Sequence, residues 1–199
     1  MTLQSWALRT GHRYVERFDQ ELVQLYSEMM RIPNDTTILS DGLTLTALTL
    51  GDADEMTKVL RDERLHEFTG GSPMNLEELK DRYQRLVSDS SRQDEFWLNW
   101  IMRTLDGLAI GTMQATIVAS DDGASLAYVA WVIGSAWQGG GFATEAAQSL
   151  VSWLRGLGVD TIEAHVHRDH HASATVARRA GFLPTSELID GEIVWRQNE

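Results

Sequence analysis

Three strand-like segments joined by short turns constrain the fold of this chain more than any other feature. They read FWLNWIMRTL, LAIGTMQATIV and SLAYVAWVIG, with Asp-Gly signals at residues 106–107 and 122–123 between them. Alternating, β-branched and aromatic residues favour strands, and Asp-Gly favours a tight turn. Consecutive strands joined by short turns pair antiparallel. The segments therefore predict an antiparallel meander.

The chain before the meander is predicted to be mainly helical, with one strand. An apolar residue at every third or fourth position over 13–30 indicates an amphipathic helix. LTLTALTL, at 43–50, alternates as a strand does and is expected to begin the sheet. Two further helices are expected, one over 53–62 and one over 72–87, the second with Ser72 as its cap.

A helix, a strand and a second helix are predicted after the meander. Apolar residues follow helical spacing from Gly141 to Gly156 and again over 172–182, and they alternate as in a strand over 160–167. Two short strands are expected to close the chain. A strand, a helix and a strand in succession indicate a parallel crossover. The expected order is αβααβββαβαββ. It corresponds to an α/β domain with a mixed central sheet and helices on both faces.

Composition excludes several functional classes. The 199 residues contain no cysteine, which excludes a disulfide framework, a Cys-type zinc site and a Cys nucleophile. The formal charge of −12 argues against a nucleic-acid partner and would attract a cationic substrate. No apolar run approaches the roughly 18 residues that cross a bilayer, and the N-terminus lacks a signal peptide's apolar middle segment. We expect a cytoplasmic protein with no membrane partner.

The sequence AWQGGGFATEA, at 136–146, places three consecutive glycines between a strand and a helix. Such a turn can aim free backbone N–H groups and the positive end of a helix dipole at an anion, typically phosphate, although it also serves as a simple tight connection. A Walker P-loop needs Gly-Lys-Ser/Thr, whereas Phe142-Ala143-Thr144 follows Gly141. A dinucleotide-binding turn lies early in a parallel unit rather than after a meander. Neither an NTPase nor a Rossmann fold is therefore expected.

Two sequence blocks, QGGGFA at 138–143 and HHASATVARRAGF at 170–182, flank one predicted strand. They resemble the pyrophosphate loop and the N-x-A-S…GF segment of the GNAT (Gcn5-related N-acetyltransferase) superfamily, in its ribosomal-protein-alanine and antibiotic acetyltransferase branch. The resemblance is close over residues 126–184. It implies a GNAT acetyltransferase domain over 36–199, preceded by a helical extension over 1–35.

The resemblance implies acetyl-CoA as cosubstrate and requires no metal. In such a fold the glycine-loop amides bind the pyrophosphate, and the last meander strand splays from the strand over 160–167. Free backbone groups in the resulting gap pair with the pantetheine arm like an added strand. His170 stands where the family usually has Asn. The cofactor-binding residues are expected to be Val132, Ile133, Gln138, Gly139, Gly140, Gly141, Phe142, Ala143, Thr144, His170 and Ser173.

The implied reaction is direct transfer of the acetyl group to an amine in a ternary complex. The amine must lose a proton, and the departing thiolate is helped by an acid. Ala177 occupies the position of the family's frequent Tyr acid, and Tyr128 that of a frequent Glu on the strand before the loop. We expect Ser173 to act as the acid, unless it is only a helix cap. The catalytic residues are therefore expected to be Ser173, Tyr128 and Glu163. Glu163 and His165 could act as base, directly or through water, or be ordinary solvated residues.

Other side chains admit further interpretations. Trp97 and Trp131 could line an acceptor pocket or pack in the core. Histidines 165, 167, 170 and 171 could suggest a metal, but no Asp/Glu-His helical pair supports one, so none is expected.

The acceptor and the function of the chain each allow two interpretations. The acceptor is a small cationic amine or a protein N-terminus. The N-terminal helix over 13–30 could cover the acceptor cleft, form a homodimer contact, or cover the sheet. The alternative function is a catalytically inactive GNAT-like domain that binds CoA or a partner, which Ala177 and Tyr128 would favour.

Overall fold

The computed structural model describes residues 35–197, apart from 69, 89–94 and 120–123. The helix expected over 13–30 lies outside the described residues. The elements are, in chain order, β1 Ile38–Leu39, β2 Leu43–Ala47, α3 Ala53–Val59, α4 Leu76–Val87, β3 Glu95–Thr104, β4 Ala109–Ala119, β5 Ser125–Ile133, α5 Phe142–Gly156, β6 Thr161–His167, α6 His171–Arg179, β7 Phe182–Ile189 and β8 Glu192–Gln197. Short 3-10 helices lie at Leu50–Asp52, Glu63–His66 and Ser135–Trp137.

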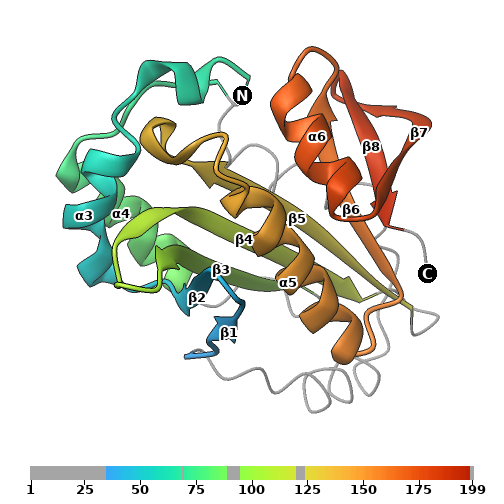
Figure 1. Ribbon diagram of the computed structural model, residues 1–199, viewed down its shortest axis with the longest axis horizontal. Coiled ribbons are helices and arrows are strands. Elements are labelled where there is room, and N and C mark those ends of the chain that lie inside the picture. The colour runs from blue at the N-terminus through green and yellow to red at the C-terminus, as the bar shows by residue number, and fades with distance from the viewer. Residues whose placement is uncertain (1–34, 69, 89–94, 120–123, 198–199) are drawn as a thin grey trace.

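The strands form one mixed sheet in the order β1-β2-β3-β4-β5-β6-β8-β7. Helix α5 crosses one face, and α3 and α4 cover the other (Figure 1). The predicted meander is confirmed, since β3, β4 and β5 pair antiparallel in sequence order. Gly107, with φ +87°, makes the turn between β3 and β4 in a conformation that favours glycine. The predicted α/β class with a mixed sheet is also confirmed.

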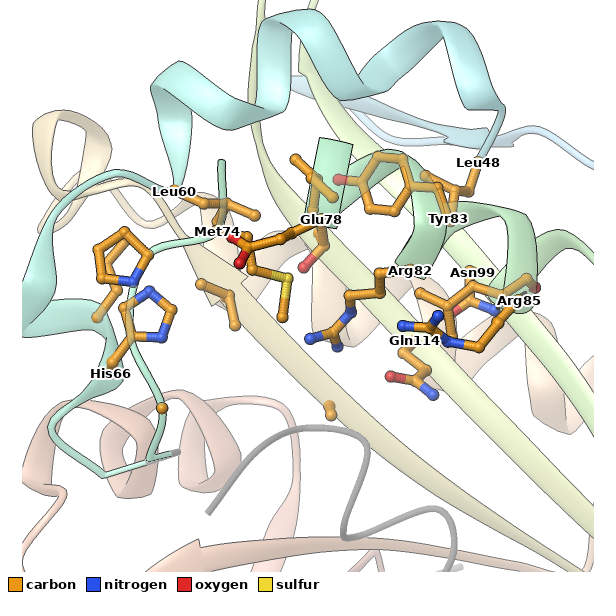
Figure 2. A pocket seen from close by; sticks show the side chains of 18 of the residues that line it. Leu48, Leu60, His66, Met74, Glu78, Arg82, Tyr83, Arg85, Asn99 and Gln114 are labelled. Atoms are coloured by element: carbon orange, nitrogen blue, oxygen red, sulfur yellow. Dashed lines mark hydrogen bonds between the residues drawn. The ribbon is translucent and has the colours of Figure 1, made fainter. Parts of the chain in front are cut away.

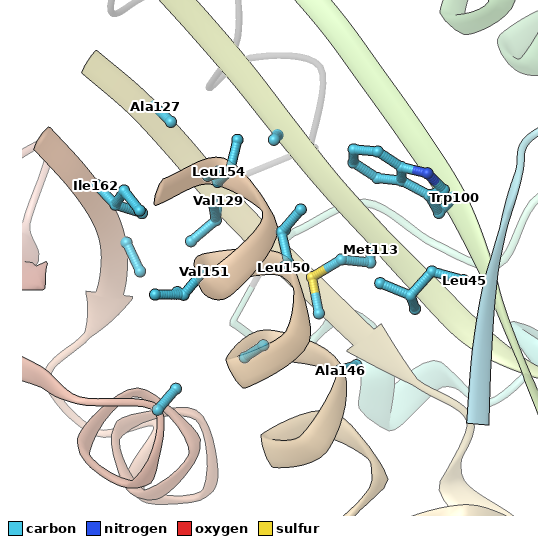
Figure 3. Close-up of a cluster of buried hydrophobic side chains, with 14 of the residues drawn as sticks. Leu45, Trp100, Met113, Ala127, Val129, Ala146, Leu150, Val151, Leu154 and Ile162 are labelled. Carbon is cyan, nitrogen blue, oxygen red and sulfur yellow. The ribbon is translucent and has the colours of Figure 1, made fainter. Parts of the chain in front are cut away.

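The core is formed mainly between α5 and the sheet (Figure 3). Leu150 and Leu154 are fully buried, and they pack in one cluster with Met113 and Val129 of the meander and with Ile162 of β6. Burying a leucine side chain is worth about 1.5–3 kcal/mol. Ala146 and Ala147 belong to the same cluster and hold the first turns of α5 on the sheet, close to the three glycines that follow β5.

Two element boundaries differ from the sequence-based prediction. Helix α4 begins at Leu76 rather than near Ser72, because Asn75 caps it. The Asn75 side chain accepts from the Glu78 N–H at 3.0 Å, and Glu78 accepts from the Asn75 N–H at 2.8 Å. This reciprocal pair satisfies two donors at once, which no serine at 72 could do. Strand β2 ends at Ala47, earlier than predicted.

The C-terminal part of the sheet was only partly predicted. Strand β6 pairs parallel with β5, as the crossover requires, and β8 inserts between β6 and β7. Asp190 and Gly191 have φ of 51° and 86°, which suits the tight hairpin turn predicted there. No helix in the described part of the chain is both long enough and apolar enough to span a bilayer.

Candidate active site

Strands β5 and β6 pair over only part of their length and then diverge in the middle of the sheet. Their register covers only three pairs, the last of which joins Tyr128 to Glu163. Beyond this point β6 pairs only with β8. Residues 129–133 of β5 therefore border an opening on the side away from β4. We call this opening between β5 and β6, which begins after Tyr128 and Glu163, the fork.

The register decides which main-chain groups of β5 face the fork. Gly134 donates its N–H to the Ile110 carbonyl at 2.9 Å. Because antiparallel pairing alternates every second residue, the polar main-chain groups of Val132 face β4, and those of Trp131 and Ile133 face the opening. The Ile133 carbonyl accepts from the Gln138 side chain at 3.2 Å. The geometry thus favours Trp131 and Ile133, rather than Val132, as main-chain ligands at the fork.

The glycine loop after β5 presents a row of backbone donors. Gly139 and Gly141 have φ of 79° and 86°, and Gly141 is the N-cap of α5 without a side-chain cap. Thr144 donates its N–H to the Gly141 carbonyl at 3.0 Å, but the N–H groups of residues 139–143 have no acceptor among the residues described. Free amides at a helix N-terminus are an anion-binding arrangement. The loop can therefore hold a phosphate group.

Three candidate side chains meet at the base of the fork. Glu163 is 5% exposed, and its Oε1 accepts from Arg196 Nε at 2.7 Å. Its Oε2 lies 3.7 Å from Nε2 of His165, and the His165 ring meets the Tyr128 ring edge-on at 5.6 Å. Burial acts to raise the pKa of Glu163, but hydrogen bonds from His165 and Arg196 outweigh it and leave the pKa lowered. A carboxylate held in this way is a weak base and orients His165 instead.

The ionised Glu163 makes stability dependent on pH. Since its pKa is lowered on folding, its contribution is present above the unfolded value of 4.5 and is lost as pH falls through the folded value. We expect the free energy of unfolding in urea to fall less between pH 6 and pH 3 in Glu163→Gln than in the wild type. The control is Glu77→Gln, which alters an exposed carboxylate on α4. An equal fall in Glu163→Gln and the wild type would contradict this prediction.

The start of α6 lies just beyond the end of β6. His170 is the N-cap, and its Nδ1 accepts from the Ser173 N–H at 3.4 Å. The His170 ring stacks on Phe68 at 4.3 Å, and Phe68 also contacts His167. Burial lowers the pKa of His170, which keeps Nδ1 available as an acceptor. His170 thus performs the capping that an Asn would.

Ser173 is half-buried at the third position of α6. Its hydroxyl makes no hydrogen bond to any residue that the structure describes, because the cap is supplied by His170. The interpretation of Ser173 as the helix cap is therefore wrong. Its hydroxyl remains available for another role.

A cavity of about 420 Å³ lies on the sheet face opposite α5, below α4 (Figure 2). Trp131 and Val132 of β5 line it, so it meets the strand that borders the fork. Trp97 is absent from the described residues that line it, and its indole instead donates to Glu95 at 2.6 Å. Over the described ranges, no group of three or more His, Asp or Glu side chains could hold a metal ion.

Two cavity residues, Arg82 and Tyr83 of α4, were not predicted as site residues. Tyr83 lies on the apolar stripe of α4, so its position in the sequence predicts a core residue rather than a site residue. Arg82 lies three residues after Leu79 and four before Leu86, both on that stripe. A charge on the apolar side of an amphipathic helix is the signal that could have identified it.

Comparison with family models matches residues 42–183 to an acetyltransferase (GNAT) domain, which is more than half of the chain. No curated protein matches the sequence closely enough to count as a relative.

Solved structures with the same fold match this chain over nearly all of their own length. An acetyltransferase of the GNAT family from Bacillus anthracis is 12% identical, with a TM-score of 0.66 over 81% of this chain and 96% of that chain. RimL, a ribosomal L7/L12 α-N-protein acetyltransferase in complex with coenzyme A, is 18% identical, with a TM-score of 0.66 over 81% and 97%. AAC(6')-Ib in complex with paromomycin and acetyl-CoA is 20% identical, with a TM-score of 0.65 over 78% and 92%. At these identities the similarity shows the fold.

Proposed function

The chain belongs to the GNAT acetyltransferase family, and on that premise we propose that it transfers an acetyl group from acetyl-CoA to a primary amine in a ternary complex. The observation that carries the proposal is the row of unoccupied amides over residues 139–143, directly after a strand that borders a fork. Two proteins of similar structure were solved with CoA or acetyl-CoA bound. We assign this activity to a domain over residues 36–199, with residues 1–35 as an extension.

The proposed cosubstrate position follows from the loop and the fork. The pyrophosphate would accept hydrogen bonds from the glycine loop, whose donors also profit from the dipole of α5. The pantetheine arm would run along β5 and pair with the main-chain groups of Trp131 and with the N–H of Ile133, whose carbonyl already accepts from Gln138, as an added strand does. This path brings the thioester toward the base of the fork.

The side chains around the fork would then handle protons. His165, held by Glu163, and Tyr128 are the candidates for taking the proton of the attacking amine, directly or through water. A main-chain N–H of β5 would stabilise the oxyanion that forms when the amine nitrogen attacks the carbonyl carbon. Ser173 would donate a proton to the sulfur as the carbon–sulfur bond breaks.

The acceptor is proposed to enter through the 420 Å³ cavity. The cavity meets β5 at residues 130–132, beside the path proposed for the pantetheine arm. Proteins of similar structure act on ribosomal protein L7/L12 or are solved with the antibiotic paromomycin. Both a protein N-terminus and a small amine are therefore candidate acceptors.

Two measurements test the proposed function. Isothermal titration with CoA should give saturable binding, and release of free thiol from acetyl-CoA should require an added amine. Absence of CoA binding at high protein concentration would refute the proposal. Binding without turnover across a broad amine panel would instead favour a catalytically inactive CoA-binding domain, the alternative suggested by Ala177 and Tyr128.

A further inference from the structure

Arg82 is a charged side chain of the cavity with no counter-ion among the described residues. It is half-buried on α4 and extends into the cavity (Figure 2). Within the described ranges, it makes neither an ion pair nor a side-chain hydrogen bond. Burial lowers its pKa, the nearby charge of Arg85 lowers it further, and no carboxylate in the described part of the chain opposes this. A desolvated guanidinium without a partner carries a free-energy cost that a bound anion would remove.

Other arginines of this protein show how such a charge is normally satisfied. Arg103 pairs with Asp52 at 2.5 Å and with Glu55 at 2.9 Å. Arg155 donates to the carbonyls of Val159 and Asp160 and to Gln197. Both are partly buried, and both have several acceptors. Arg82 lacks such acceptors among the described residues, and its side chain faces a cavity instead.

Two further polar groups of the cavity wall have no hydrogen-bond partner among the residues that the structure covers. They are Nε2 of His66 and the hydroxyl of Tyr83, and both atoms are buried. Burial raises the pKa of Tyr83, which keeps the phenol protonated and able to donate. His66 lies across the cavity from Arg82 (Figure 2). Buried polar groups are nearly always hydrogen-bonded, so these two atoms mark the wall beside Arg82 as polar.

The carboxylates at the cavity do not compensate Arg82. Glu78 accepts the Asn75 N–H at 2.8 Å in the cap of α4, which holds its carboxylate at the helix start. Asp81 is exposed, and no ion pair joins it to Arg82 in the described part of the chain. The wall therefore presents the Arg82 guanidinium, with Arg85 three residues further along α4, to whatever fills the cavity.

We propose that the acceptor is an amine that carries an anionic oxygen group, a carboxylate or a phosphate, and that Arg82 binds this group. The proposal rests on the acetyl transfer proposed above. A guanidinium recognises either group through paired hydrogen bonds. The net charge of −12 would favour a cation, but exposed charges are screened by solvent and salt, whereas the half-buried Arg82 acts at contact distance on a group inside the cavity. We correspondingly expect acceptors with several positive charges to be poor substrates.

The test uses pairs of amines that differ in the presence of an anionic group at the far end. β-Alanine is compared with β-alanine amide, and O-phosphoethanolamine with ethanolamine; putrescine supplies a cationic end. Thiol release at saturating acetyl-CoA should favour the acid or the phosphate over its neutral partner by about 10- to 100-fold in kcat/KM, through KM. Preference for β-alanine identifies a carboxylate, and preference for O-phosphoethanolamine identifies a phosphate.

Matched variants locate the effect. Arg82→Met should reduce the preference to nearly one, whereas Arg179→Met, which removes an exposed arginine of α6, should leave it unchanged. Equal use of charged and neutral amines by the wild type, or an unchanged preference in Arg82→Met, would overturn the proposal.

Binding separates this proposal from the proposed function. Calorimetry on the CoA-saturated protein measures the binding of β-alanine and O-phosphoethanolamine without requiring turnover. Binding that Arg82→Met abolishes supports the anionic ligand even if no amine is acetylated, in which case only the acetyl transfer fails. If neither anionic amine binds better than its neutral partner, Arg82 does not select an anion, whatever the turnover.

Discussion

Gly141→Val is expected to lower the affinity for CoA by at least about 100-fold, or about 2.8 kcal/mol. The residue has φ +86°, which a β-branched side chain rarely adopts. A Cβ at this position meets nothing within 4 Å, so a side chain would project into the space from which an anion must approach the free amides. Isothermal titration with CoA measures the loss.

Backbone strain alone could also weaken binding, and Gly158→Val controls for it. Gly158 has φ +83° and equally open surroundings, but it follows the far end of α5. Both variants should lose similar stability in urea, and only Gly141→Val should lose CoA. Retained CoA affinity in Gly141→Val would show that the loop does not bind the pyrophosphate.

Ser173→Ala is expected to lower kcat by about 100-fold while leaving the affinity for CoA nearly unchanged. A positioned acid typically contributes 10²–10⁴-fold, and the hydroxyl bonds to no described residue, since His170 caps the helix. Single-turnover thiol release with a saturating amine measures the chemical step, and calorimetry measures CoA binding.

Two substitutions make the result specific for the hydroxyl. Ser173→Thr retains the group and should recover much of the rate. Ser152→Ala removes an exposed serine from α5 and should have no effect. If Ser173→Ala is as fast as the wild type, another group protonates the thiolate.

The sequence predicts best the elements that local chemistry determines. The meander follows from alternation and turn residues over 95–134, and the stripe of α5 from helical spacing alone. The prediction of Ser72 as the cap of α4 was wrong because Ser72 and Asn75 are both residue types that cap helices well. Only the reciprocal hydrogen bonds between Asn75 and Glu78 decide between them.

Features that depend on long-range packing were harder to predict. The fork was expected only through the family resemblance, because nothing local to Tyr128 or Glu163 ends their pairing. The insertion of β8 between β6 and β7 is likewise a matter of tertiary register. Arg82 lines the cavity because α4 packs over the meander. The sequence of a helix does not show which neighbours its side chains face, so this position could not be predicted.

The fork also bears on how this sheet avoids aggregation. Unpaired strand edges invite pairing with other chains, and the outer edges here are protected: β1 has two residues, and β7 carries Pro184 next to a register irregularity. The open segment of β5 is an edge of another kind, because it lies inside the sheet with β6 still attached at Tyr128. A slender extended ligand can enter such a notch, but the edge of a second sheet cannot. The protein thus keeps exposed hydrogen-bonding groups for a ligand without offering them to its own copies.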